Sequence, residues 1–324
     1  MKKVTLFKSA LIALLACVGI AACNNDATEV PTEPETYTVN LGWAGEILDV
    51  SYEPMTRAAT DDLYGIQVYS KPKTAGDETS WSKYAYGLFD DPSNITITLA
   101  GGYKYRFVAS MVKDGKNKVY NDEEYGYSTP FNIKMDNKFY YESTYCLNLN
   151  LGAVDLQDKG IYPHPNIERF YGELSDYIPG ENNTNAKIDM KRTSFCAKFI
   201  AGGKLAVDGK MEIQINGAPK MELALTDDTD QISDIFTFYF VEAAWANNDY
   251  TEDIAVNFKW IRADGTEAPL GTHTITVKRN VTTVVKVNID KDGNDESLGI
   301  EIDESETGTM PDGDEVIITN GQME

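Results

Sequence analysis

Cysteine and histidine have the greatest capacity for nucleophilic and metal chemistry in this chain, and both are scarce. The 324 residues include four cysteines and two histidines. His273 alternates with Ile275 and Val277, as expected of a strand residue in a core or at an edge. His164 stands between two prolines, with no cysteine or acid at metal-ligand spacing. With no catalytic triad, phosphate loop or dinucleotide fingerprint, the sequence predicts no enzymatic activity, no metal and no cofactor.

The acidic residues offer two further kinds of chemistry. The stretch DKDGNDESLGIE at 290–301 has carboxylates or an amide at calcium-loop positions one, three, five and twelve, namely Asp290, Asp292, Asn294 and Glu301. Asp295 replaces the glycine that such a loop needs, so a polar hairpin explains the stretch more simply. Adjacent acids elsewhere are expected on solvated faces of a chain whose formal net charge is −22. A hydrolase built on paired carboxylates is therefore a weak hypothesis for the function of this chain, behind the structural and binding roles considered below.

The thiol of Cys23 has a more specific setting. Lys2, Lys3 and an apolar stretch from Ser9 to Cys23 have the layout of a secretory signal. The stretch is too short to cross a bilayer. Ile20-Ala21-Ala22-Cys23 resembles the lipobox of bacterial lipoproteins, in which the cysteine is diacylated before the signal is cut. This resemblance implies a signal peptide at 1–22. It also implies that the exported protein is anchored to a lipid membrane through acylated Cys23, at the outer membrane or cell surface. A plain signal cut near Ala22 is the alternative.

The net charge limits which partners the protein can bind, and the remaining cysteines limit which disulfides it can form. The mature chain would keep roughly 300 residues, enough for two domains. Its acidic balance excludes nucleic acid as a partner, because neutralising phosphates requires clustered lysine and arginine. Cys146 and Cys196 could form one disulfide in an oxidising compartment. Their neighbours on each strand face are polar, so both thiols could equally point away from the main cores.

Hydrophobic residues recur with period two along most of the chain. Tyr37, Val39, Leu41 and Trp43 alternate with polar or small residues, and glycine-containing turn signals interrupt such runs at short intervals. The pattern predicts an all-β protein with two β-sandwich domains in tandem. We expect a tether at 23–36, sandwiches at 37–165 and 186–303, and an acidic tail at 304–324. A short helix or loop is expected at 166–178.

Three segments resemble the fimbrillins, the lipoprotein-derived type V pilins of Gram-negative gut and oral bacteria. They are EPMTRAATDDLYGIQVYS at 53–70, LAGGYKYRFVAS at 99–110 and THTITVKRNVTTVVKVNI at 272–289. The resemblance implies transthyretin-like, Greek-key sandwiches and cleavage by an arginine-specific protease after the matching Arg57, which leaves Ala58 as the new first residue. The chain departs from the family after Arg279-Asn280, where Val281 replaces an aromatic residue.

The resemblance also implies a structural role. Cleavage after Arg57 would release the first strand, and a strand of another subunit would refill the groove left by Tyr37, Val39, Leu41 and Trp43. The expected partners are other pilin subunits, by self-polymerisation or co-assembly, and a host or glycan ligand during adhesion. The alternative is a surface glycan-binding lipoprotein, in which exposed aromatic side chains stack on sugar rings. Its candidates are Trp81, Tyr84, Tyr86 and Trp245.

Overall fold

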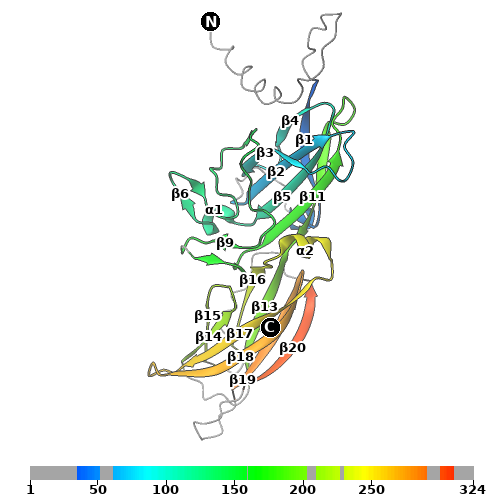
Figure 1. Ribbon diagram of the computed structural model, residues 1–324. Coiled ribbons are helices and arrows are strands. Elements are labelled where there is room, and N and C mark those ends of the chain that lie inside the picture. The colour runs from blue at the N-terminus through cyan, green and yellow to red at the C-terminus, as the bar shows by residue number, and fades with distance from the viewer. Residues whose placement is uncertain are drawn as a thin grey trace, which may run out of the picture. The chain divides into compact units, whose positions relative to one another are not determined.

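The computed structural model describes residues 35–51, 61–158, 160–202, 209–226, 230–289 and 300–309. The helices and strands in these ranges belong to one compact unit that begins at Thr36. Most of them are strands, which confirms the all-β prediction (Figure 1). Within the described ranges, no helix is long and apolar enough to cross a membrane.

The N-terminal part is one eight-stranded sheet with the order β4-β1-β12-β11-β5-β2-β3-β8. The pairings are antiparallel except that of β1 with β12, which is parallel. The strands are β1 (Thr36–Gly45), β2 (Leu63–Pro72), β3 (Ser82–Phe89), β4 (Thr96–Ala100), β5 (Tyr103–Val112), β8 (Lys138–Tyr140), β11 (Arg169–Tyr177) and β12 (Asn185–Arg192).

This sheet is covered on both faces. Its concave core includes Val39, Ile66, Phe107 and Ile188. Tyr84, on β3, donates a hydrogen bond to the carbonyl of Thr98 on β4 (2.9 Å), and the Thr98 N–H donates to the hydroxyl of Tyr141 (2.9 Å). Because β3 and β4 lie near opposite ends of the strand order, these bonds show that the sheet curls around the concave core.

The other face packs against the segment between β5 and β11. This second core joins sheet residues such as Leu63 and Tyr171 to segment residues such as Phe131 and Leu149. Apart from β8, the described residues of this segment contain only short elements, which are α1 (Gly115–Lys118), β6 (Asn121–Asp122), β7 (Gly126–Tyr127), β9 (Val154–Asp155) and β10 (Ile161–Tyr162). A six-residue 3-10 helix, η1 (Glu46–Ser51), follows β1.

The C-terminal part is a pair of four-stranded sheets with the orders β16-β13-β19-β20 and β15-β14-β17-β18. One core fills the space between them, and Phe199, Phe236, Phe258 and Trp260 are among its members. The elements are β13 (Ser194–Gly202), β14 (Lys210–Ile215), β15 (Met221–Ala224), β16 (Gln231–Thr237), α2 (Val241–Ala246), β17 (Thr251–Ile261), β18 (Glu267–Lys278), β19 (Val281–Ile289) and β20 (Ile300–Thr309).

The expectation of a short helix or loop at 166–178 is wrong, because these residues contain strand β11. Phe170 and Tyr171 are consecutive and both are buried. Phe170 packs in the concave core and Tyr171 in the second core. A strand covered on both faces loses the alternation of apolar and polar residues by which strands are recognised.

Two expected boundaries also differ from the structure. Residues 185–192, assigned mostly to the C-terminal domain from the sequence, form β12 and pair with β1 and β11 in the N-terminal sheet. The expected acidic tail at 304–324 begins inside β20, which pairs with β19 as far as Thr309. Main-chain hydrogen bonds do not depend on side-chain polarity, so an acidic segment can still pair along an open strand edge.

Candidate functional site

The first strand is the centre of the candidate site. Thr36–Asn40 of β1 pairs antiparallel with β4, and Asn40–Gly45 pairs parallel with β12. The Asn40 N–H donates to Thr184 O and the Leu41 N–H donates to Ile95 O, both at 2.8 Å. Although β1 is the first strand of the described chain, it lies inside the sheet, with a neighbour on each side.

The side chains of β1 follow the period-two pattern. Val39 is 0% exposed and Leu41 is 4% exposed, whereas Thr38 and Asn40 are exposed. Tyr37 and Trp43 are half-buried against the concave core. The Trp43 indole N–H donates to Pro92 O (3.2 Å), and its ring lies 5.5 Å from that of Tyr64. β4, β12 and the concave core therefore form a slot that holds β1 by main-chain bonds and by apolar contacts.

A glycine turns the chain out of the slot. Gly45 has a φ of +80°, and an added Cβ would lie 2.1 Å from Asp189 Oδ1 and 2.8 Å from Met190 O. Side chains rarely adopt this backbone conformation, and here there is no room for one. The next residues are therefore directed to fixed places, with Ile47 buried in the concave core and Glu46 facing two arginines.

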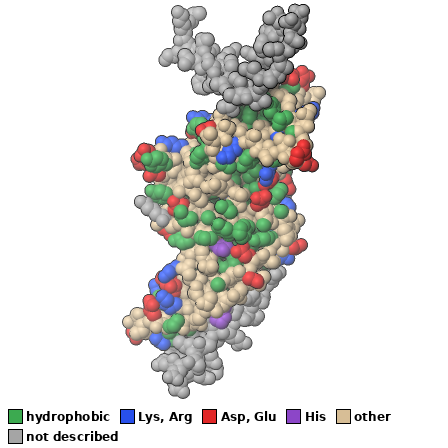
Figure 2. Space-filling model, viewed as in Figure 1, with side chains coloured by type: hydrophobic (Ala, Val, Ile, Leu, Met, Phe, Trp, Pro, Cys, Tyr) green, Lys and Arg blue, Asp and Glu red, His purple; other side chains and the backbone are tan. Residues whose placement is uncertain are grey.

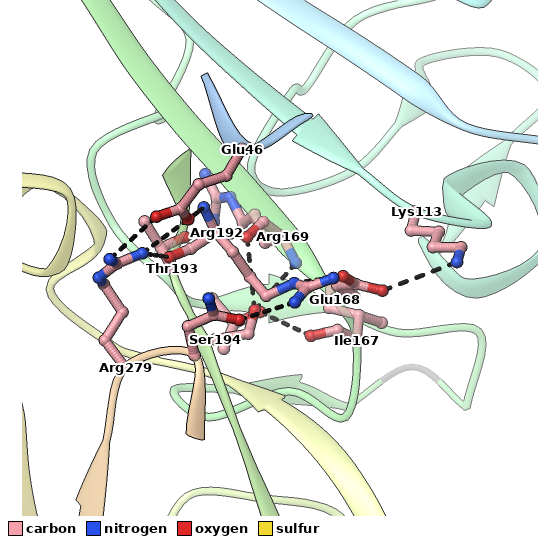
Figure 3. Close-up of polar contacts among 11 residues, drawn as sticks. Glu46, Lys113, Ile167, Glu168, Arg169, Arg192, Thr193, Ser194 and Arg279 are labelled. Atoms are coloured by element: carbon pink, nitrogen blue, oxygen red, sulfur yellow. Dashed lines mark hydrogen bonds and ion pairs between the residues drawn. The ribbon is translucent and has the colours of Figure 1, made fainter. Parts of the chain in front are cut away.

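Glu46 binds groups that come from much later in the chain (Figure 3). Arg279 donates from Nη1 to Glu46 Oε2 (2.7 Å) and from Nη2 to Oε1 (3.0 Å), which is a two-point guanidinium–carboxylate pair. The main-chain N–H of Arg192 donates to Glu46 Oε2 at 2.9 Å. The Arg279 side chain is 5% exposed and that of Glu46 is 30% exposed. This pair fastens the end of the first strand to the turn between β18 and β19.

The ionic contacts extend from this pair into the sheet. Arg192 donates from Nε to Glu168 Oε1 (2.6 Å), and both side chains are almost fully buried. Lys113 Nζ lies 3.8 Å from the other oxygen of Glu168. Buried ion pairs of this kind are costly to break, because removing one partner leaves the other charge without water or a counter-ion.

Arg169 is bound differently. It donates from Nε to Ser110 Oγ (2.7 Å), from Nη1 to Leu151 O (2.6 Å) and from Nη2 to Leu149 O (2.8 Å), all of them neutral acceptors. Complete burial lowers the pKa of Arg169 to about 9. Its role is to hold the segment before β9 against the sheet, close to the ion pairs but without a carboxylate partner among these contacts.

The two histidines are structural in their geometry. His164 lies with Nδ1 2.9 Å from Asn216 O and Nε2 3.1 Å from Glu252 Oε1. His273, on β18, packs edge-on against Phe258 at 6.0 Å between ring centroids. Among the described residues, no group of three or more histidine, cysteine or acidic side chains could hold a metal ion.

The possible disulfide is not present, because Cys146 and Cys196 are both free. Cys146 Sγ lies 3.3 Å from the Tyr69 hydroxyl in the N-terminal part. Cys196 lies on β13 in the C-terminal part and is 1% exposed, and burial raises the pKa of its thiol to about 11. Cys146 lies in the irregular segment between β8 and β9, and the sequence could not give its distance from Cys196 on β13.

The aromatic candidates for sugar binding pack against their own chain. Tyr86 is 7% exposed, and Tyr84 lies edge-on to Tyr105 at 5.1 Å. Trp245 donates to Asp189 O (3.2 Å), and Trp81 lies beneath the Lys71 ammonium at 4.7 Å. On the face shown in Figure 2, basic and acidic side chains are interspersed, so the negative charge excess does not gather there into one patch.

Several sequence-based site predictions lie outside the described residues. These are the lipidation site Cys23, the processing site at Arg57 and Ala58, residues 290–299 of the calcium-like stretch, and the tail beyond Thr309. They stay predictions. Sequence reasoning also missed Glu46, Arg192 and Arg279. A Gly-Glu pair directly after an apolar strand, and an arginine at a hairpin turn, were the available signals.

No family model and no curated protein matches the chain. Solved structures similar to it include the tip fimbrial protein Mfa3 of Porphyromonas gingivalis, at 12% identity and a TM-score of 0.32, covering 84% of this chain and 98% of that one. The fimbrial anchor protein Mfa2 of the same organism is 7% identical, with a TM-score of 0.37 and coverages of 84% and 97%.

A candidate adhesin of Bacteroides ovatus is 10% identical, with a TM-score of 0.40, and covers 88% of this chain and 96% of its own. At such identities and TM-scores, the likenesses decide neither the detailed fold nor the function of this chain.

Proposed function

We propose that this chain is the lipoprotein precursor of a fimbrial subunit, which assembles by donor-strand exchange after its first strand is removed. In this proposal Cys23 is acylated and the precursor reaches the outer membrane and the cell surface. An arginine-specific protease then cuts after Arg57. The subunit has no catalytic activity, and its partners are other pilin subunits in a fimbria that mediates adhesion.

The interior position of β1 carries the proposal. Loss of an edge strand leaves one open edge, whereas loss of β1 leaves two, on β4 along the first half of the vacated position and on β12 along the second half. It also uncovers the core filled by Val39 and Leu41, whose burial contributes about 3–6 kcal/mol together. This is a large part of the stability of about 5–15 kcal/mol that is typical of a domain. An incoming strand would restore the main-chain bonds and the burial together.

The chain connectivity makes this exchange possible. The segment that includes β1 and η1 ends at Ser51, and β2 begins at Leu63. Arg57 lies between these two residues in the sequence. A cut there would separate β1 from the other described strands of the sheet, all of which begin at or after Leu63, so that only non-covalent contacts would hold it.

Assembly after cleavage is the decisive test. The Cys23→Ala precursor, which cannot be acylated, should stay monomeric until an arginine-specific protease cuts after Arg57, and should then form ladders that resist mild detergent. Arg57→Ala protein should stay single under the same treatment. Arg57→Lys keeps the charge and is the matched control, because trypsin can cut it and the arginine-specific enzyme cannot.

If the cut fragment leaves and the remainder stays monomeric at high concentration, donor-strand exchange is wrong for this chain. Saturable binding of a polysaccharide by that monomer, measured by calorimetry, would then favour the glycan-binding alternative. The intact mass of the native protein gives an independent reading. A first residue at acylated Cys23 means that the strand is retained, and a first residue at Ala58 means that it has been removed.

A further inference from the structure

The ion pair at the end of the first strand has the properties of a binding site rather than of a simple contact. The carboxylate of Glu46 is the ligand, and the Arg279 guanidinium and the Arg192 N–H are the receptor. The ligand lies on the segment that the proposed function removes. The receptor groups lie on elements that stay.

The receptor groups are held in place without the help of Glu46. The Arg279 N–H donates to Tyr250 O (2.9 Å), and Arg279 Nη1 also donates to Arg192 O (2.9 Å). The next residue, Asn280, donates from its N–H to Ser194 O (2.9 Å) and accepts from Arg192 Nη1 (2.7 Å). Departure of the first strand would therefore leave a preorganised guanidinium with its donors still directed at the vacated position.

Charge around the site favours an anion. Arg279, Arg192 and Lys113 lie in this cluster with two carboxylates, those of Glu46 and Glu168 (Figure 3). Removal of Glu46 would leave three cations and one acid in a mostly buried setting, within a chain whose net charge is −22. The Arg279 side chain is 5% exposed, so water could replace the carboxylate only in part.

From this geometry we infer that the Arg279 guanidinium and the main-chain N–H of Arg192 form a carboxylate-binding site that selects the incoming strand. The inference rests on the proposed function. Glu46 fills the site in the uncut chain, and an acidic residue of another subunit's strand fills it after exchange. The recognised strand has apolar residues at alternate positions, as at Val39 and Leu41, followed by a glycine and an acid, as at Gly45 and Glu46. Apolar contacts set the register of the strand, and the carboxylate decides which strand is retained.

The first experiment uses the uncut Cys23→Ala protein and does not depend on cleavage. Hydrogen exchange of the β1 amides is compared in Glu46→Gln and Glu35→Gln variants. Glu35 precedes β1 and is exposed, so its variant removes the same charge without touching the site. We expect exchange at least about tenfold faster in Glu46→Gln, because loss of one partner of a buried charge pair is strongly destabilising. Equal exchange in the two variants overturns the carboxylate site.

The second experiment tests the receptor after cleavage at Arg57. Isotope-labelled peptides of residues 35–51 are offered to the cut protein, and their incorporation is followed by intact mass. The wild-type and Glu35→Gln peptides should be retained equally, and the Glu46→Gln peptide at least about tenfold less. With Arg279→Gln as the receptor, the three peptides should become equivalent, which identifies Arg279 as the partner.

The outcomes separate this inference from the proposed function. If all three peptides enter the wild-type slot equally well, strand exchange is supported and selection by the carboxylate is refuted. If the native fragment never leaves and no peptide enters, strand exchange fails and the selection of an incoming strand fails with it. Hydrogen exchange then still decides whether Glu46 fastens the first strand.

Discussion

The two parts of the molecule differ in what completes their cores. The concave core of the N-terminal sheet includes Val39 and Leu41 from β1 and Ile47 from η1, so it depends on a segment at the start of the folded chain. In the described residues, the core of the C-terminal sheets is built from Phe195 onwards. One part can therefore be opened by removing a strand while the other keeps its packing. In the proposed strand exchange, the C-terminal part would present Arg279 as a fixed feature while the N-terminal slot changes its occupant.

A charge placed in the N-terminal core should have the largest effect. Val39→Asp puts a carboxylate at a position that is 0% exposed, so we expect a loss of at least about 3 kcal/mol of unfolding free energy. Hydrogen exchange should rise across β1, β4 and β12 and stay unchanged in the C-terminal strands. The neighbouring, exposed Thr38→Asp is the matched control and should leave both parts as they are. Loss of protection in both parts of Val39→Asp would show that the two cores are not independent.

A methyl group at the exit of the slot should have the next largest effect. In Gly45→Ala, the positive φ and the contact with Asp189 and Met190 should cost about 1–3 kcal/mol, as measured by denaturant unfolding. Gly42→Ala lies on the same strand, and there the nearest atom to an added Cβ is 3.9 Å away. That control should be close to neutral. Similar losses in the two variants would remove the argument that Gly45 directs Glu46 towards the arginines.

Loss of the bond from Tyr84 to Thr98 should have a smaller effect that depends on cleavage. In the uncut protein β1 pairs along one edge of β4, so Tyr84→Phe should cost only about 0.5–1.5 kcal/mol. Once β1 has left, tyrosine hydroxyls hold β4, and the same variant should then expose β4 to rapid hydrogen exchange. Tyr125→Phe, at a position 71% exposed, is the control. An unchanged β4 in cut Tyr84→Phe protein would mean that other contacts hold this edge.

The sequence predicted strands in which apolar residues alternate, and it missed β11, which faces two cores without such a pattern. Strands with one buried face, such as β17 with Val256, Phe258 and Trp260, keep the strict alternation from which strands were expected. Phe170 and Tyr171 are buried on opposite faces of the same sheet, so the alternation disappears and β11 was not foreseen. Local pattern also cannot show that β12 returns to pair with β1, because that pairing joins residues about 145 positions apart.

The residues of the candidate site also divide into those that a local sequence pattern predicted and those that only the fold brings together. The alternation of Tyr37, Val39, Leu41 and Trp43 is local, and it predicted which side chains of β1 face the core. The partnership of Glu46 with Arg279 spans 233 positions, and nothing in the sequence near either residue indicates the other. Charged residues are common in this chain, so an ion pair becomes visible only when the fold brings its members together.

The smallest expected effect is an absence of change at Cys196, which gives a direct probe of the C-terminal part. Thiolate is the reactive form, and a thiol with a pKa of about 11 has only about one thousandth of its molecules ionised near pH 8. Cys196 is also 1% exposed, whereas Cys146 is half-buried, so an alkylating reagent should modify Cys146 first. Below about pH 11 the rate of the slow alkylation of Cys196 should rise roughly tenfold per pH unit in the folded protein.

Mass spectrometry of Val39→Asp protein should find Cys196 as protected from alkylation as in the parent chain, because the sheet that contains Cys196 needs no residue from β1 for its core. Rapid modification of Cys196 in that variant would show that opening the N-terminal slot also loosens the C-terminal sheets, and Arg279 could then not serve as a preorganised receptor.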